Sequence, residues 1–143
     1  MAVTISLYNH SARLFADGSN AAADSYKLKL YTAATYTAAD TTLAGIVGTE
    51  ATAGTGYVAG GKALTTVAVT TVTTNDAKFD ADDVIWTATG GSITASYAVL
   101  YNATDANSPP IAFIDFGGSQ SAGDTTDFKV VWSANGIFTF TVA

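Results

Sequence analysis

The sequence predicts an all-β protein: a single-domain jelly roll or β-sandwich of about eight strands, with one or two short helical turns in its N-terminal half. Three observations lead to this fold class. Apolar and polar residues alternate over short runs, as in residues 92–101, where Ile93, Ala95 and Tyr97 share one face. β-Branched residues are dense in residues 65–73, TTVAVTTVT, which suits a pleated surface. Turn-forming residues separate these runs, and no long amphipathic helix pattern is present.

The predicted strands follow one another along the chain with turn signals between them. The tandem prolines at 109 and 110 end a turn over residues 105–110, and residues 117–124 have the composition of a loop. The step Asn135-Gly136 favours a positive φ and a tight hairpin between the last two strands. The predicted strands are residues 3–7, 26–31, 65–73, 84–88, 92–101, 111–116, 128–132 and 137–142.

The N-terminal half is less regular than the rest of the chain. Residues 9–16 are expected to form one or two helical turns that end near Gly18, because glycine commonly terminates a helix. Residues 36–45 have room for one more turn. These segments belong to two irregular excursions, near 9–24 and 32–61, from a single domain that spans residues 1–143.

The surface is expected to be acidic and poor in charge. Charged residues make up 13% of the chain and its net charge is −6, whereas a typical domain has about 25% charged residues. Because an acidic surface repels phosphate, we expect no nucleic-acid partner. The chain has no apolar stretch long enough to span a bilayer and no secretory signal, so we expect no membrane partner and no export route. The lack of cysteine excludes disulfides and thiolate metal sites.

Side chains that could perform catalysis are scarce. His10 is the only histidine and Glu50 is the only glutamate, and no serine has the glycine spacing of a nucleophile elbow. We therefore expect no catalytic residue, no cofactor and no enzymatic activity. A hydrolase that uses Asp80, Asp115 or Glu50 is the enzymatic alternative.

An acidic run, DAKFDADD, occupies residues 76–83. Within it, Asp80, Asp82 and Asp83 could supply the carboxylate oxygens that calcium prefers, so they form a weak candidate metal site. The run lacks the glycine and the distal glutamate of a hand-type calcium loop. A solvated turn, in which the aspartates accept hydrogen bonds from the local backbone, is the preferred interpretation.

Five segments follow one another in a recognisable order: SLYNHSARLFADG, YKLKLYTAATYTAADTTLAG, GTGYVAGGKALT, DAKFDADDVIWTATGGSITASYAVLYN and FIDFGGSQSAGDTTDFKVVWSANGIFT. Together they resemble a family of small proteins encoded among the virion structural genes of tailed bacteriophages. The resemblance covers nearly the whole chain, and DAKFDADDVIWTATGGSITA is its most specific part. It is a likeness of linear pattern that brings no catalytic residues with it.

The resemblance implies a structural protein of the virion, and by further analogy a capsid cement or decoration protein bound to the outer head lattice. The expected partners are then the major capsid protein and copies of the chain itself, as a homodimer or homotrimer. The expected location is the capsid surface, after synthesis in the host bacterial cytoplasm. A tail, collar or head–tail junction protein is an alternative within the particle. A carbohydrate-binding module for host attachment, using Trp86 and Trp132, is an alternative of another class.

A packing subunit needs surface anchors, and the irregular excursions are where we expect them. Aromatic and large apolar side chains in loops suit this purpose. The alternative is that they close the ends of the domain itself. The candidate interface residues are Leu14, Phe15, Tyr31, Tyr36 and Tyr57.

Overall fold

The chain folds into three antiparallel sheets, one large and two small. The computed structural model describes residues 3–72 and 75–141. The helical segments within that part are α1 (Ser11–Ala16) and the single 3-10 turn η1 (Leu43–Gly45). The strands are β1 (Thr4–Leu7), β2 (Tyr26–Ala34), β3 (Gly48–Glu50), β4 (Lys62–Ala63), β5 (Ala68–Thr71), β6 (Ala77–Asp80), β7 (Val84–Thr87), β8 (Ile93–Asn102), β9 (Pro110–Ala122), β10 (Asp127–Val130) and β11 (Phe138–Phe140).

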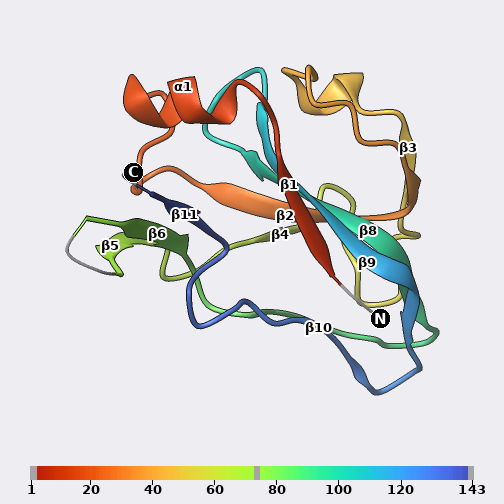
Figure 1. Ribbon diagram of the computed structural model, residues 1–143. Helices are drawn as coiled ribbons and strands as arrows, with labels where there is room; N and C mark the ends of the chain where they lie inside the picture. Colours follow the sequence, from red (N-terminus) through yellow and green to blue (C-terminus); the bar gives the residue numbers. More distant parts are fainter. Residues whose placement is uncertain (1–2, 73–74, 142–143) are drawn as a thin grey trace.

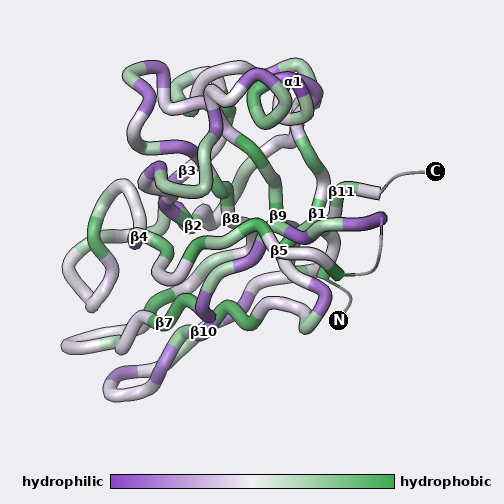
Figure 2. Tube along the Cα trace, turned by 90° about the vertical axis from the view of Figure 1, so that its left-hand side faces the viewer, coloured by the Kyte–Doolittle hydropathy of each residue, from purple (hydrophilic) through white to green (hydrophobic). Residues whose placement is uncertain are grey.

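The large sheet has the strand order β1-β9-β8-β2-β3, and β4 also pairs with β2. The two small sheets are β10-β7 and β11-β6-β5. Figure 1 shows the small sheets lying below the large one, with α1 at the top, on the same side of the molecule as β5, β6 and β11. The side view in Figure 2 also separates β7 and β10 from the large sheet as a second layer. This two-layer arrangement confirms the all-β fold class, with more strands than the sequence predicts.

The main core fills the space between the layers. From the large sheet it takes alternate residues such as Leu28, Leu100 and Ile114, and from the small sheets it takes Phe79 and Trp86. Alternation of this kind is what places every second strand residue on one face. Because these side chains are almost completely buried, the core joins all three sheets into one hydrophobic unit.

A second, smaller core covers the opposite face of the large sheet. Val99 and Phe113 belong to the alternate set on β8 and β9, and they pack with Tyr8, Tyr31 and Ile46. The segment that carries η1 lies over this face, with Leu43 packed against the cluster. The central strands are therefore buried on both faces, which explains the nearly continuous buried run at the start of β9.

Several predicted elements agree with the structure. Strands occur within or across all eight predicted runs, and the predicted helical turn at 9–16 is α1, followed by Gly18 with a φ of +81°. Three short strands, β3, β4 and β6, were not predicted. The predicted strand ends at Thr73 and Val142 lie outside the described residues.

The loop predicted at residues 117–124 is wrong for most of its length. β9 continues to Ala122, and Ala122 pairs with Ile93 of β8. Gly117 and Gly118 have positive φ values of +76° and +148°, and the ladder shifts register near this point. The glycines thus form an irregularity inside a strand, because a strand can absorb an extra residue and continue.

The predicted hairpin between the last two strands is also wrong. The turn itself is present: Gly136 has a φ of +89° and donates a hydrogen bond to the Ser133 carbonyl at 2.9 Å. However, β10 pairs with β7, whereas β11 pairs with β6 in a different sheet. The Asn-Gly step sets the local turn, while burial of each strand selects its partner.

Candidate functional site

The carboxylates of the acidic run have partners within the chain. Asp80 makes an ion pair with Lys78 at 2.9 Å, and its other oxygen accepts the Ala81 N–H at 3.0 Å. The residues alternate along β6, so that the buried Phe79 faces the core between these two charged side chains. The start of the run is therefore a strand, held by an ion pair on its outer face.

Asp82 and Asp83 are also occupied by local partners. The hydroxyls of Thr65 and Thr66 donate to Asp82 at 3.2 and 2.6 Å, and Asp83 accepts the Trp132 N–H at 3.0 Å. Within residues 3–72 and 75–141, no three acidic or histidine side chains lie close enough together to hold an ion. The carboxylates of the candidate metal site, Asp80, Asp82 and Asp83, thus each contact lysine, threonine or backbone donors, as expected for a structured turn.

His10 and Ser11 attach α1 to the large sheet. His10 Nε2 donates to the Pro110 carbonyl at 2.7 Å, and the buried Ser11 hydroxyl donates to the Ile111 carbonyl at 2.9 Å. Both side chains therefore hold the helix against the start of β9. Asp115, one of the three residues of the hydrolase alternative, accepts the Gly117 N–H at 2.8 Å and supports the irregularity in β9.

Three of the five candidate interface residues are core residues. Leu14, Tyr31 and Tyr57 are buried by the chain's own strands and loops, so they are not surface anchors. Phe15 is half-buried in an aromatic group. Tyr36 keeps about a third of its surface exposed, and its hydroxyl donates to the Leu7 carbonyl at 2.5 Å. Leu14, Tyr31 and Tyr57 therefore fit the alternative interpretation, in which these side chains pack inside the domain.

The two tryptophans offer no platform for a sugar. Trp86 and Trp132 are 4% and 9% exposed, and both belong to the main core. Trp132 Nε1 donates to the Asp82 carbonyl at 3.1 Å, which satisfies its polar edge. A carbohydrate platform needs an open aromatic face, so the proposed role of these tryptophans in sugar binding is corrected to a structural one.

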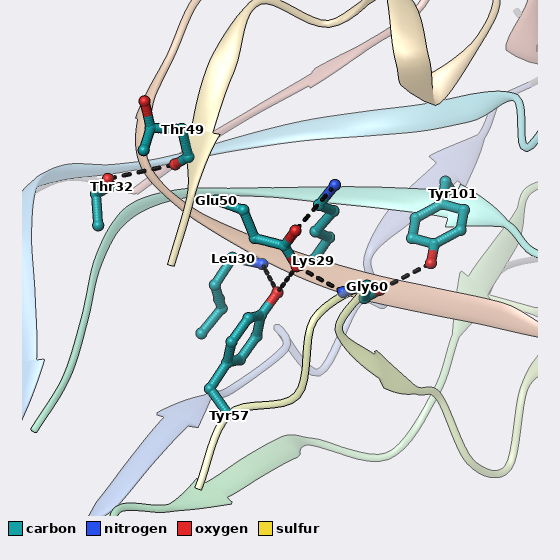
Figure 3. A network of polar contacts seen from close by, with 8 residues as sticks. All are labelled: Lys29, Leu30, Thr32, Thr49, Glu50, Tyr57, Gly60 and Tyr101. Atoms are coloured by element: carbon teal, nitrogen blue, oxygen red, sulfur yellow. Dashed lines mark hydrogen bonds and ion pairs between the residues drawn. The ribbon is translucent and has the colours of Figure 1, made fainter. Parts of the chain in front are cut away.

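Figure 3 shows a polar network around Glu50 that was not predicted from the sequence. Its Oε1 accepts hydrogen bonds from the Tyr57 hydroxyl at 2.9 Å and from the Gly60 N–H at 2.5 Å. Its Oε2 lies 3.3 Å from the Lys29 ammonium. The Tyr57 hydroxyl in turn accepts the Leu30 N–H at 3.1 Å. The sequence signal was available, because Lys29 alternates with buried leucines along β2 and the lone glutamate ends β3.

The network fastens residues 51–61 to the large sheet. Tyr101 of β8 donates to the Gly60 carbonyl at 2.7 Å, and the Gly61 position has no room for a side chain because a Cβ would overlap the Leu28 carbonyl. Gly61 has a φ of +88°, which favours glycine. The segment expected to be a loose surface excursion is therefore tightly held to β2 and β8.

Electrostatics within this network favour a fixed, charged pair. Burial alone would lower the pKa of Lys29, but the neighbouring Tyr31 and Glu50 outweigh burial and the pKa is raised. The Lys29 ammonium also lies 5.2 Å from the centre of the Tyr31 ring. Desolvation raises the pKa of Tyr57 well above its usual value. Because Tyr57, Gly60 and Lys29 already bind the Glu50 carboxylate, it acts as a structural acceptor.

An open apolar edge is the remaining surface feature. Val3, directly before β1, is 59% exposed, and Ile5 and Leu7 on β1 are 38% and 40% exposed. Val3 and Ile5 line a groove of about 330 Å³ between the large sheet and the segment after β10, where Val131 is 63% exposed. Exposed apolar residues that cluster beside a groove are typical of interaction surfaces. We name this feature, β1 with its groove, the β1 edge.

No protein-family model matches the chain, and no curated protein or solved structure is detectably similar to it. Among the described residues, no helix combines the length and the hydropathy needed to cross a membrane.

Proposed function

We propose that this chain is a structural protein of a tailed-bacteriophage virion, and that it acts as a capsid cement or decoration protein on the outer head lattice. The observation that carries the proposal is the β1 edge, an exposed apolar strand beside an apolar groove. Such a surface suits a subunit whose work is to pack against neighbours. The sequence also resembles virion structural proteins of tailed bacteriophages, and this resemblance suggests the virion as the assembly in which the chain packs.

The internal construction suits a subunit that transmits force between its neighbours. The large sheet is packed on both faces, and the Glu50 network holds the longest irregular segment against β2 and β8. A rigid body of this kind transmits force between neighbours without rearranging its loops. Capsid stabilisation through many weak contacts requires that property, since each contact must keep its geometry.

We also propose that the chain performs no catalysis. The candidate catalytic groups have structural partners: Glu50 holds a loop, His10 holds a helix, and Asp115 supports a strand irregularity. A catalytic carboxylate or imidazole instead faces a site where a substrate can reach it.

Quantitative gel analysis of purified virions tests the role in the head. A decoration protein repeats over the lattice, so we expect on the order of hundreds of copies per particle. About six to twelve copies would instead place the chain in the tail, collar or head–tail junction, and would overturn the decoration role. Complete absence of the chain from purified virions would overturn the virion role altogether.

A further inference from the structure

β1 has one hydrogen-bonding side free. It lies at the end of the large sheet, where β9 is the one neighbouring strand within residues 3–72 and 75–141. The Tyr8 N–H donates to the Ile111 carbonyl at 3.0 Å, in register with the β1–β9 ladder. Since alternate residues of an antiparallel strand bond to the same neighbour, the N–H and C=O groups of Val3, Ile5 and Leu7 point away from β9. The Tyr36 hydroxyl bonded to the Leu7 carbonyl agrees with this direction.

β1 is short, with four residues, but this side of it lacks the other features that usually protect a sheet edge. Residues 3–6 are Val-Thr-Ile-Ser, with no lysine, proline or glycine, and the β1–β9 register runs without a bulge. The other end of the sheet differs: β3 has only three residues, and its pairing with β2 contains a register shift. Natural proteins protect exposed edges or use them for pairing, so the β1 edge is expected to pair.

The charge distribution indicates what pairs with it. The chain has twelve acidic and six basic residues, so contact between most faces of two copies would bring carboxylates together. The β1 edge is an exception, because β1 is uncharged and, of the described residues that line its groove, Lys129 alone is charged. Asp115 of β9 lies opposite Thr4, one strand behind the contact, and its carboxylate accepts the Gly117 N–H. A second copy can therefore approach with no carboxylate on the two pairing strands themselves.

We propose that β1 of one copy pairs antiparallel with β1 of a second copy, about a two-fold axis at Thr4. In this register Val3 of each copy lies opposite Ile5 of the other, and their free backbone groups satisfy one another. The bond between Tyr36 and the Leu7 carbonyl is left intact. The inference deepens the proposed function and rests on it for its purpose, because self-contacts of this kind link subunits on a shell.

Sedimentation velocity on the purified chain tests the dimer. A pairing of one short strand is small beside a standard interface of about 800 Å² per partner, so we expect a monomer near about 1 µM and a dimer by about 500 µM. Salt should strengthen the dimer, because it screens the repulsion between two chains of net charge −6. A chain that stays monomeric over this range, at low and high salt, overturns the proposal.

Two variants and a matched control identify the surface. Ile5→Lys and Val3→Pro should shift the midpoint of dimerisation at least about tenfold, since one places a charge at the contact and the other removes a free donor. Val58→Lys is the control, because Val58 is 70% exposed on the loop before β4. Both lysine variants reduce the net negative charge equally, so a loss confined to Ile5→Lys cannot come from net charge. Equal effects of the two lysines would overturn the assignment to β1.

Amide hydrogen exchange gives a second readout on the unmodified chain. The Ile5 N–H is free in the monomer and should become protected as concentration rises, whereas the Tyr8 N–H should be protected throughout. Protection of Ile5 only on isolated capsid shells, with a monomer in solution, would assign the edge to a capsid subunit and overturn self-pairing. A dimer that pairs through β1 but is absent from virions would leave this inference standing and overturn the proposed function.

Discussion

At the scale of single residues, Glu50 shows how one side chain can organise a segment. Its carboxylate joins a donor on β2 to two donors in the following loop, and only about a quarter of it is exposed. The hydroxyl of Tyr57 extends the network to the Leu30 N–H, which belongs to a buried strand. A charged acceptor with several donors in a partly buried position is worth more than an exposed ion pair.

Replacement of Glu50 by alanine should lower the free energy of unfolding by about 2–3 kcal/mol, because the Tyr57 hydroxyl and the Gly60 N–H lose their acceptor. Glu50→Gln is the matched control. It keeps an acceptor oxygen and loses mainly the ion pair with Lys29, so the expected loss is about 1 kcal/mol. Urea unfolding measures both. Equal stabilities of the wild type and Glu50→Ala would show that the network does not hold the loop.

At the scale of elements, the sequence predicts strands better than it predicts their partners. Alternation locates the first parts of β8 and β2 well, because buried and less buried residues alternate there, whereas the second half of β8 is buried on both faces. It fails for β6, where the charged Lys78 and Asp80 flank Phe79 and the acidic composition indicated a turn. It fails also at Gly117, since a glycine inside a strand has the same local signal as a glycine in a loop.

The candidate site was less predictable than the fold, for a physical reason. The Glu50 network joins residues from β2, β3 and β8 and from the loop before β4, and only the folded sheet brings them together. Tyr57 was expected at an interface because it lies in a glycine-rich stretch, yet the core takes up its ring. The exposure of Val3, Ile5 and Leu7 likewise depends on β1 lying at the end of the sheet.

The attachment of α1 to β6 and β11 can be tested at this scale. The Phe15 ring contacts the rings of Phe79, Phe138 and Phe140, at centroid distances of 5.4, 5.6 and 5.4 Å. Phe15→Ala should therefore destabilise the chain by about 2–3 kcal/mol and speed amide exchange in α1 and β11 together.

Arg13→Ala is the control within the same helix. Arg13 makes only an exposed ion pair with Asp17, so this change should stay within about 0.5 kcal/mol of the wild type. Faster exchange in α1 alone after Phe15→Ala would contradict an aromatic link between α1 and β11.

At the scale of the whole molecule, burial of tyrosine hydroxyls makes the free energy of unfolding depend on pH in the alkaline range. Desolvation raises the pKa of Tyr8, Tyr26, Tyr31, Tyr57 and Tyr101 above the usual value of 10.0. Below that pH the folded and unfolded chains both keep these protons, so stability is unaffected by them. Above it the unfolded chain releases protons that the folded chain retains, and the free energy of unfolding falls as pH rises.

We therefore expect these five tyrosines to ionise together with unfolding. Phenolate absorbance and β-sheet circular dichroism, followed in the same alkaline titration, should change in one common transition above pH 10. Ionisation of the five while the circular dichroism is still native would contradict their burial in the folded state.

The central claim is that this chain is a surface subunit of a phage head, and a reconstruction of the intact particle tests it most directly. The account predicts density for this two-layer β fold on the outer face of the head lattice, repeated at equivalent positions, with β1 at a contact between copies. Density for the chain only along the tail axis or at the neck, or a head surface without it, would contradict the account.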